Sequence, residues 1–306
     1  MRVLLTGITG SIGSTLLPRL VADGHEVRGF SRDARRAAAA APGAEVVAGD
    51  AVSGAGLDAA LEGVEVAYFL IHSMEGLDAG FGARERTAAE NFVAAARRAG
   101  VRRVVYLGGL VPEHERLSRH LGSRLDVERV LLAGLPEAVA LRASIVIGAR
   151  SRSFRFLVRL VERLPILALP GWRVHRTAPV DARDVTAFLA AAATTPQAEG
   201  GLSLDLGGPD VLTYQEMIER IADLMLVRRP ALTLSLNATP VASRVAAAIA
   251  GEDPGLIGPL MESLTDDLLP RDGRAPALLG VRLHSFDSAV ERALREWEAV
   301  EELAAR

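Results

Sequence analysis

The chain has 306 residues, of which 49% are hydrophobic and 24% charged, and its formal net charge is -3. This composition is typical of a globular protein and gives no basic surface of the kind that binds nucleic acid. There is no Cys, and all 35 residues in the Lys and Arg count are Arg. A disulfide scaffold, a Cys nucleophile, a thiolate zinc site and a Tyr-x-x-x-Lys catalytic pair are therefore excluded.

Short apolar runs alternate with helical patterns through the first half of the chain. Helices are expected over about Gly13–Asp23 and Arg84–Ala99. Strands separated by such helices predict right-handed βαβ units and a parallel sheet that is covered on both faces. The expected fold class is therefore α/β, with a Rossmann-type doubly wound parallel sheet. The runs that predict its strands are Val3–Leu5, Glu26–Phe30, Glu45–Val47, Val64–Ile71, Val101–Leu107 and Ala138–Leu141.

In the second half of the chain the pattern is less regular. Phe154–Leu164 is expected to be a helix and Leu202–Leu206 a strand. Thr213–Leu226 is a further expected helix, and Thr213 with Glu216 forms a capping box. The remaining residues are expected to form short helical pieces interrupted by prolines.

These elements predict two lobes. Residues 1–148 and about 176–226 are expected to form the Rossmann core, whereas 149–175 and 227–306 form a smaller, mainly helical C-terminal lobe that binds substrate. The first residues lead directly into a strand without the features of a signal peptide. No apolar stretch reaches the roughly 18 residues that cross a bilayer, so we expect a cytoplasmic protein without membrane contact.

The strongest chemical signal is a glycine-rich loop that directly follows the first strand and opens a helix. Gly7 permits a tight turn, Gly10 lets the backbone approach a pyrophosphate, and Gly13 allows close packing of the helix. The helix N-terminus then offers free N–H groups and the positive end of its dipole to the phosphates. The loop predicts a dinucleotide site lined by Thr6, Gly7, Thr9, Gly10, Ser11, Ile12 and Gly13.

The end of the second strand distinguishes the two nicotinamide cofactors. NAD binders usually carry an acidic residue here for the ribose hydroxyls. In this sequence Ser31 and Arg32 occupy the position, with Arg35 one turn further on. A hydroxyl and guanidinium groups suit the 2′-phosphate of NADPH, which is the cofactor we expect. The alternative is a solvated basic helix start in which Asp33 neutralises Arg32.

Several segments together resemble a known family. They are the glycine loop, Gly49-Asp50, Tyr68–Met74 and Val104–Gly109, and the match continues through Pro179–Val185 and Leu206–Pro209. With them the chain resembles an atypical short-chain dehydrogenase/reductase of the NAD(P)H-binding branch related to nitrogen-metabolite-repression regulators. The resemblance implies that Asp50 meets the adenine and that the segment ending at Ser73 runs beside the nicotinamide ribose. The further cofactor contacts expected here are Gly49, Asp50, Ile71, His72, Ser73, Leu107 and Gly108.

The sequence departs from typical reductases of this superfamily at the catalytic position. The fifth strand ends in Gly108-Gly109 instead of the usual Ser, and His120 and Arg124 replace the usual Tyr and Lys at the same spacing. Arg124 is expected to hold the nicotinamide ribose. His120 is expected to donate a proton to a reduced carbonyl oxygen, because its ordinary pKa of ~6.5 needs no neighbouring cation. The alternative places both on the surface of an amphipathic helix. The other candidate proton sources are Tyr106, Ser123 and His72.

Three functions remain open. The first is an NADPH-dependent reductase of a ketone or enone on an apolar small molecule, such as an aromatic polyketide, because some atypical relatives are ketoreductases of that type. The second is a non-catalytic NADP(H)-binding redox sensor or scaffold, and the third is a non-redox isomerase that retains the cofactor. We expect no metal, a small-molecule substrate, and a monomer or homodimer. The pocket is expected from the helical tail with Phe154, Phe156, Leu157 and Trp172.

Overall fold

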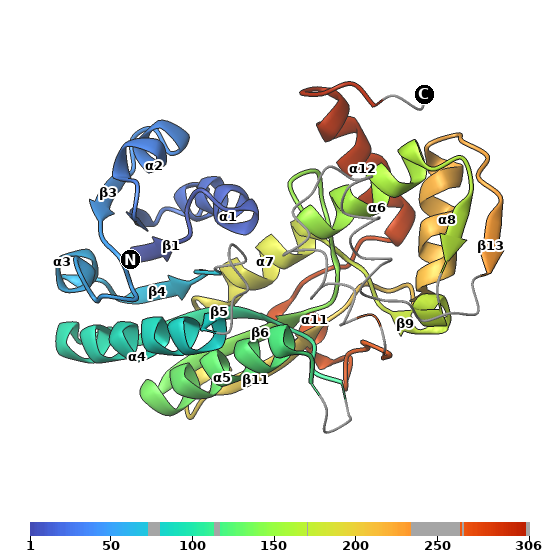
Figure 1. Cartoon of the computed structure of the whole chain (residues 1–306). Helices are drawn as coiled ribbons and strands as arrows, with labels where there is room; N and C mark the ends of the chain where they lie inside the picture. The colour runs from blue at the N-terminus through green and yellow to red at the C-terminus, as the bar shows by residue number, and fades with distance from the viewer. Residues whose placement is uncertain (73–79, 113–116, 170, 234–263, 265, 304–306) are drawn as a thin grey trace.

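A seven-stranded sheet, parallel throughout, forms the centre of the N-terminal lobe (Figure 1). The computed structural model describes residues 1–72, 80–112, 117–169, 171–233, 264 and 266–303. The strands are β1 (Arg2–Thr6), β2 (Glu26–Ser31), β3 (Glu45–Ala48), β4 (Val66–Phe69), β5 (Arg103–Gly109), β6 (Glu137–Ala143) and β11 (Leu202–Leu206). Their order is β11-β6-β5-β4-β1-β2-β3. The order reverses beside β1, which is the point where doubly wound sheets bind ligands, and the predicted fold class is confirmed.

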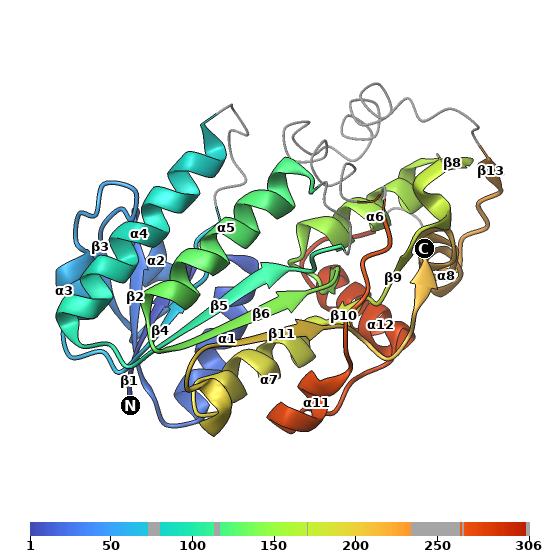
Figure 2. The same ribbon diagram turned by 90° about the horizontal axis from the view of Figure 1, so that it is seen from below.

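Helices cover both faces of the sheet (Figure 2). One face packs against α1 (Ser11–Ala22), α2 (Ala34–Ala40) and α7 (Ala182–Ala192). The other face packs against α3 (Leu57–Leu61), α4 (Phe81–Ala99) and α5 (Arg119–Gly134). The central strand β4 shows the effect of two covered faces, because its four residues are all apolar or aromatic and all buried.

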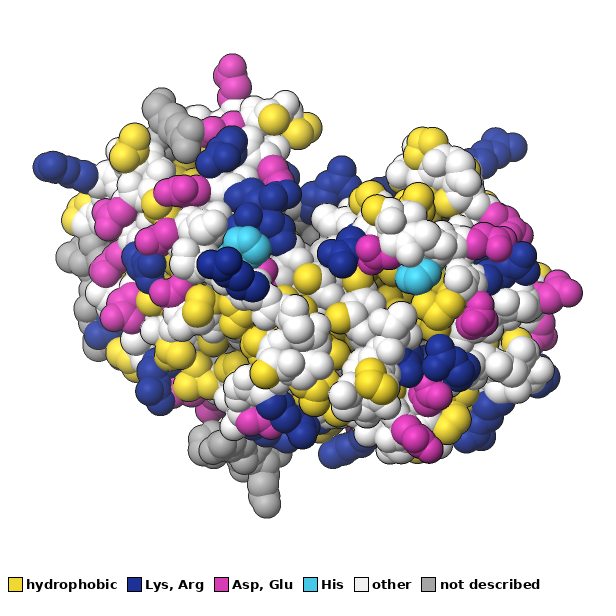
Figure 3. Space-filling view, turned by 180° about the vertical axis from the view of Figure 1, so that it is seen from behind, with side chains coloured by type: hydrophobic (Ala, Val, Ile, Leu, Met, Phe, Trp, Pro, Cys, Tyr) yellow, Lys and Arg dark blue, Asp and Glu magenta, His cyan; other side chains and the backbone are white. Residues whose placement is uncertain are grey.

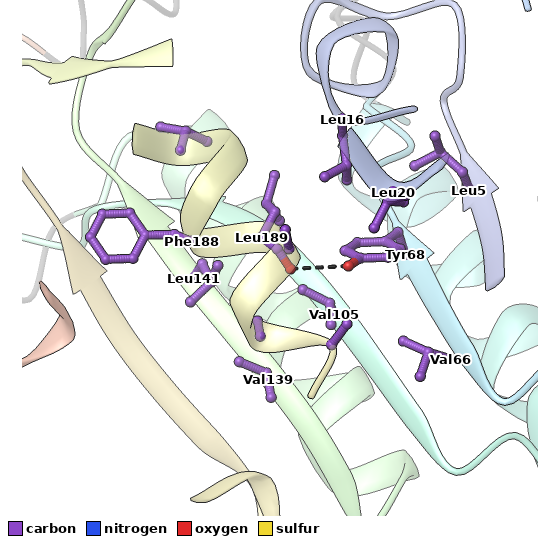
Figure 4. Close-up of a cluster of buried hydrophobic side chains, with 14 of the residues drawn as sticks. Leu5, Leu16, Leu20, Val66, Tyr68, Val105, Val139, Leu141, Phe188 and Leu189 are labelled. Atoms are coloured by element: carbon purple, nitrogen blue, oxygen red, sulfur yellow. Dashed lines mark hydrogen bonds between the residues drawn. The ribbon is translucent and has the colours of Figure 1, made fainter. Parts of the chain in front are cut away.

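Tyr68 shows how tightly the first face is closed. Its ring is fully buried in the apolar cluster beneath α1 and α7 (Figure 4). The hydroxyl donates a 3.0 Å hydrogen bond to the carbonyl oxygen of Leu189 on α7. The polar end of the ring is thereby satisfied inside the core, and it ties the sheet to the helix that covers it.

The C-terminal lobe has a core of its own. It is built chiefly from α6 (Arg152–Arg163), α8 (Tyr214–Leu224) and α12 (Phe286–Glu298). The predicted capping box of α8 is confirmed, since Thr213 Oγ1 accepts from Glu216 N and Glu216 Oε2 accepts from Thr213 N. The remaining elements are β7 (Val146–Ile147), β8 (Leu167–Leu169), β9 (Arg176–Thr177), β10 (Val180–Asp181), β12 (Leu212–Thr213), β13 (Ala231–Thr233), α11 (Arg274–Leu279) and the 3-10 turns η1 (Gly171–Val174) and η2 (Pro196–Ala198).

Packing moves two helices across the lobe boundary expected from the sequence. The helix α8 was assigned to the Rossmann core within 176–226, but its apolar side packs against α6 and α12. The helix α11 falls within 227–306, yet Ala275 and Leu279 pack in the cluster beneath α7. The predicted boundary between the lobes followed the order of the elements in the chain. The observed one follows from the apolar face of each helix, which packs into one core or the other. None of the described helices is long and apolar enough to cross a membrane.

Candidate functional site

The glycine loop folds as a close turn between β1 and α1. Gly7 has φ +65°, and a Cβ atom there would stand 2.7 Å from the carbonyl oxygen of Leu70. A Cβ atom on Gly13 would stand 2.3 Å from the carbonyl oxygen of Gly7. Both positions therefore require glycine, Gly7 for its backbone conformation and Gly13 for the approach of the helix to the loop.

The N-terminus of α1 faces outward without a side-chain cap. Gly10 is the N-cap residue, and no side-chain hydrogen bond caps the helix there. Thr9 and Gly10 are exposed, and Ser11 and Ile12 are partly exposed. The first N–H groups of α1 and the positive end of its dipole are thus presented at the switch point of the sheet. This is the arrangement that receives a pyrophosphate, so the loop fits a dinucleotide.

Thr6 supports the loop rather than lining it. The side chain is fully buried, and its hydroxyl donates to the carbonyl oxygen of Tyr68 at 2.9 Å. The same hydroxyl oxygen accepts from the backbone N–H of Leu70 at 2.8 Å. Thr6 therefore joins the ends of β1 and β4, and a direct contact with the cofactor, which the sequence suggested, does not fit its position.

The segment after β2 presents three exposed arginines, namely Arg32, Arg35 and Arg36. Asp33 does not neutralise Arg32: its carboxylate accepts from the backbone N–H of Arg36 at 3.0 Å and caps α2. Among the described residues no ion pair joins Arg32 to Asp33. Ser31 Oγ accepts from the backbone N–H of Asp33 at 3.2 Å, which holds the turn. The positive charges therefore remain beside the end of β2.

Gly49 and Asp50 lie next to this segment because β3 pairs with β2. A Cβ atom on Gly49 would stand 2.4 Å from a ring carbon of Phe30, so only glycine fits. Asp50 Oδ1 accepts from the backbone N–H of Val52 at 2.9 Å in a local turn. The carboxylate is partly exposed and lies at the same sheet edge as Ser31.

The end of β4 enters a cluster of polar side chains that lies deeper than the loop. Ile71 and His72 are partly exposed, whereas Ser73 lies outside the described residues. His72 Nδ1 lies 3.0 Å from Glu85 Oε1, and Glu85 is buried on α4. The second carboxylate oxygen of Glu85 accepts from Ser123 Oγ at 2.7 Å. Glu85 was not identified from the sequence, because a single Glu on a long amphipathic helix resembles any solvated position.

Arg124 closes the cluster from α5. Its side chain is buried, lies 3.8 Å from Glu85 Oε1 and donates to the carbonyl oxygen of Leu107 at the end of β5. The guanidinium carbon stands 4.8 Å from the ring centre of Tyr106. A contact at 3.5 Å to the carbonyl oxygen of Ile71 joins β4 as well. Arg124 is thus not on a solvated helix face; it fixes the ends of β4 and β5 beside the switch point, and Gly108 follows Leu107 directly.

Burial and charge set the protonation states in this cluster. Burial raises the pKa of Glu85, but the hydrogen bond from His72 and the charge of Arg124 outweigh it and lower the pKa to about 2. Burial, then His72 and Arg124, lower the pKa of His120 to about 3. His120 lies beside His72, with ring centres 5.1 Å apart. The free protein at neutral pH therefore holds an ionised Glu85 and a neutral His120, not the imidazolium that an ordinary pKa would allow.

Tyr106 does not take the place of the missing superfamily Tyr. Its ring is buried, and its hydroxyl donates to the carbonyl oxygen of Arg124 at 3.0 Å. Burial also raises the pKa of Tyr106 well above its usual range. The hydroxyl is therefore an internal structural donor.

The side chains that the sequence suggested for a substrate pocket lie instead inside the C-terminal lobe. Phe154, Phe156, Leu157 and Trp172 are all buried in the core of the C-terminal lobe. Trp172 packs edge-on against Tyr214 on α8, with ring centres 6.0 Å apart. These side chains hold the lobe together, because each already has apolar neighbours. Seen from behind, the surface is hollowed between the two lobes, and arginine side chains gather beside the hollow (Figure 3).

Comparison with known proteins agrees with this geometry. Residues 7–138 match the family model described as NAD(P)H-binding. The (4-alkanoyl-5-oxo-2,5-dihydrofuran-3-yl)methyl phosphate reductase of Streptomyces griseus is 30% identical over 229 residues, which cover 73% of each chain. This chain is an NAD(P)H-binding protein of the atypical short-chain dehydrogenase/reductase family.

Two further relatives match this chain over shorter segments. Subunit 9 of the mitochondrial NADH dehydrogenase (ubiquinone) 1 alpha subcomplex from Arabidopsis thaliana is 30% identical over 126 residues, and the chain spans only 31% of its length. The 3 beta-hydroxysteroid dehydrogenase/Delta 5→4-isomerase of Mycobacterium tuberculosis is 36% identical over 30% of its length.

Solved structures show the same fold over nearly the whole chain. A short-chain dehydrogenase/reductase superfamily protein from Agrobacterium tumefaciens with bound NAD has a TM-score of 0.69 at 21% identity, and the match covers 98% of this chain and 96% of that one. UDP-glucuronic acid 4-epimerase from Bacillus cereus, in complex with UDP-glucuronic acid and NAD, has a TM-score of 0.73 at 15% identity, covering 98% and 100%. At these identities the likeness concerns the fold alone.

Proposed function

We propose that the protein is an NADPH-dependent reductase of a ketone or conjugated enone on an apolar small molecule. The observation that carries the proposal is the meeting, at one edge of the sheet, of an uncapped helix N-terminus with a buried histidine–arginine cluster. The first half fits the pyrophosphate of a dinucleotide. The second half holds a buried cation, Arg124, at the ends of β4 and β5, and such a charge supports a reaction in which a substrate oxygen gains negative charge as hydride arrives.

NADPH is proposed over NADH on the charges beside β2. Arg32 and Arg35 are exposed there, and Asp33 is engaged in capping α2 instead of pairing with Arg32. A guanidinium group can bind a 2′-phosphate through two parallel hydrogen bonds, which NADH cannot offer. Ser31 supplies a hydroxyl at the same edge.

The relatives support an enone or a polycyclic ketone as the substrate class. The Streptomyces griseus protein is named as the reductase of a methyl phosphate ester of an oxo-dihydrofuran that carries an alkanoyl group, so its substrate joins a conjugated enone to a charged phosphate. The Mycobacterium tuberculosis protein is named as a steroid dehydrogenase and isomerase, which acts on an apolar polycyclic molecule. An aromatic polyketide combines both properties.

Two other functions have an observation in their favour. The loss of the Ser-Tyr-Lys set, with Gly108-Gly109 at the end of β5, favours a non-catalytic NADP(H)-binding sensor or scaffold. The imidazole of His120 lies beside that of His72, with ring centres 5.1 Å apart, and a pair of imidazoles can move a proton, which favours a non-redox isomerase that retains the cofactor.

Cofactor titration, NADPH consumption and analysis of the products together separate these functions. Calorimetric titration with NADPH and NADH gives the cofactor, and consumption of NADPH is then followed with a panel of cyclic enones, dihydrofuranones and polycyclic ketones. A reductase consumes NADPH with at least one member of the panel. Binding without turnover on any member supports the sensor, and rearrangement of an enone without net oxidation of NADPH supports the isomerase.

A further inference from the structure

The reductase needs a group that exchanges a proton with the substrate, and the usual Tyr is absent. We propose that His72 is this group, and that Glu85 is the positioning residue that orients it. The inference rests on the proposed function and differs from the sequence-based assignment of the proton to His120.

The carboxylate of Glu85 is fixed in one orientation by hydrogen bonds to both of its oxygens. Glu85 is 5% exposed, and both of its oxygens are engaged, Oε1 by His72 Nδ1 at 3.0 Å and Oε2 by Ser123 Oγ at 2.7 Å. Arg124 Nη1 lies 3.8 Å from Oε1 and balances the buried charge. Residues from the end of β4, from α4 and from α5 thus hold one imidazole in one orientation.

The same network selects the tautomer of His72. Two groups compete for Nδ1: the ionised carboxylate of Glu85, which only accepts hydrogen bonds, lies at 3.0 Å, and the guanidinium of Arg124, which only donates them, lies at 3.3 Å. We assign the proton to Nδ1 because the carboxylate is the nearer partner, so that Nδ1 donates to Glu85 and Arg124 acts on the ring through its charge alone. Nε2 is therefore the nitrogen that is left to exchange a proton with a substrate, as in any carboxylate-oriented histidine.

His120 lacks this support. Its ring contacts that of His72, but among the described residues no carboxylate is hydrogen-bonded to it. A proton donor needs a fixed orientation toward the reacting atom, which a hydrogen-bonded partner provides. His120 then serves as a ring neighbour that limits the movement of His72.

The proton step follows from this orientation. A bound nicotinamide supplies the hydride that reduces the substrate. His72 supplies the proton: the Nε2–H bond of its imidazolium breaks, an O–H bond forms on the substrate oxygen, and a neutral imidazole remains. In the opposite direction neutral His72 removes the proton of the substrate hydroxyl.

The groups that face His72 set the pH at which it carries its second proton. Burial and the charge of Arg124 lower the pKa of His72, the hydrogen bond to Glu85 opposes them, and the charge of Arg152 in the first turn of α6 adds to the lowering. His120 faces it from α5, and Phe81 approaches it from the start of α4, with ring centres 6.4 Å apart. Reduction therefore needs the minority protonated form at neutral pH, and its rate rises as the pH falls.

The first experiment needs no substrate. The ring signals of His72 are assigned in the free protein by their loss in His72→Phe, and their titration is followed by NMR in wild type, Glu85→Gln and Glu90→Gln. Glu90 lies on the same helix but is exposed and paired with Arg86 at 2.9 Å, so it is a matched control. The pKa of His72 is expected to fall in Glu85→Gln, which loses the opposing carboxylate, and to stay unchanged in Glu90→Gln. Equal titration in all three proteins overturns the positioning role of Glu85.

The second experiment measures NADPH turnover with an active member of the panel. His72→Phe is expected to lower kcat by ~10²–10⁴-fold with little change in cofactor affinity. Glu85→Gln should lower kcat about tenfold at pH 7 and move the rise in rate to lower pH. His120→Phe should lose only severalfold. Turnover that survives His72→Phe and is lost in His120→Phe overturns the assignment while leaving the reductase intact. No turnover on any compound contradicts the proposed function instead, and the NMR result still decides the role of Glu85.

Discussion

The two halves of the candidate site are built by opposite means. The cofactor half consists of backbone: Gly7 and Gly13 shape a loop, and the uncapped N-terminus of α1 presents N–H groups toward solvent. The half next to it consists of buried side chains: Glu85, His72 and Arg124 arrive from three elements and hold one another. The first half depends on a short continuous segment, and the second depends on the whole fold.

This difference separates binding from stability. A change in the exposed loop should alter cofactor affinity and leave folding intact, because within the described part of the chain a side chain at Gly10 would come close only to the carbonyl oxygen of Gly7. A change in the buried cluster should alter folding as well, because it leaves a charge without its partner in a region that excludes water. Four substitutions and pH shifts test this contrast, in order of the expected free energy.

Arg124→Met should have the largest effect. It removes a buried cation and leaves the ionised Glu85 without its balancing charge, so the free energy of unfolding should fall by about 3 kcal/mol, the lower range for a broken buried pair. Urea unfolding at pH 7 measures it. Arg129→Met is the matched control on the same helix, because Arg129 is exposed and forms an ion pair with Asp126 at the surface. If both variants lose the same free energy of unfolding, the buried cluster contributes no more to stability than an exposed ion pair does.

Gly10→Val should act on binding alone. Gly10 has φ -74°, which any residue adopts, and its Cβ atom would stand 3.1 Å from the carbonyl oxygen of Gly7, so the exposed loop has to shift by only a few tenths of an ångström to accept a side chain. The branched side chain would then cover the N–H groups of α1, and NADPH affinity should fall by ~100-fold, about 2.7 kcal/mol. Gly13→Ala is the contrasting variant, because its Cβ atom would meet the Gly7 carbonyl oxygen at 2.3 Å and destabilise the loop itself. Calorimetry together with urea unfolding separates the two effects, and a folded Gly10→Val protein with full affinity contradicts the site.

The same contrast explains what could be predicted from the sequence. The strands, the doubly wound sheet and the glycine loop were predictable, because each depends on local periodicity or on a motif of eight residues. The contact between Glu85 and His72 was not predictable, because the two residues are 13 positions apart in the chain and only the fold brings them to 3.0 Å. The pKa of His120 and the packing of α8 could not be predicted for the same reason, because burial is a property of the folded protein.

Arg32→Ala should narrow the preference for NADPH over NADH. Losing a charge-assisted contact to the 2′-phosphate should weaken NADPH binding by roughly 10- to 100-fold, about 1.5–3 kcal/mol, and leave NADH binding nearly unchanged. Titration of both cofactors against wild type and Arg32→Ala measures this. Arg19→Ala, on α1 and paired with Asp23 at 2.8 Å, is the control for the loss of one exposed positive charge. If Arg32→Ala and Arg19→Ala weaken NADPH equally, the effect is long-range attraction and not recognition of the phosphate.

Acid should destabilise the buried cluster. The folded protein holds the pKa of His120 at about 3, below its ordinary value of 6.5, so between these pH values the unfolded chain binds a proton that the folded protein refuses. The stability from the neutral imidazole is therefore fully present above pH 6.5 and is lost as the pH falls toward 3. Glu85, with a pKa of about 2 against an ordinary 4.5, adds a further loss between those values.

His120→Phe isolates the contribution of one histidine to the pH dependence of stability. It removes the proton uptake by the unfolded chain at that position, so the free energy of unfolding should fall less steeply between pH 6.5 and 4 than in wild type, by on the order of 1 kcal/mol over that range, a value reduced for solvent screening because the ring is partly exposed. Urea unfolding at stepwise pH gives both slopes. Any constant difference between the two proteins above pH 7 reflects packing of the ring and does not bear on the titration. Parallel slopes would mean that His120 titrates alike in the folded and unfolded protein, and that this side of the cluster is open to water in the way the glycine loop is.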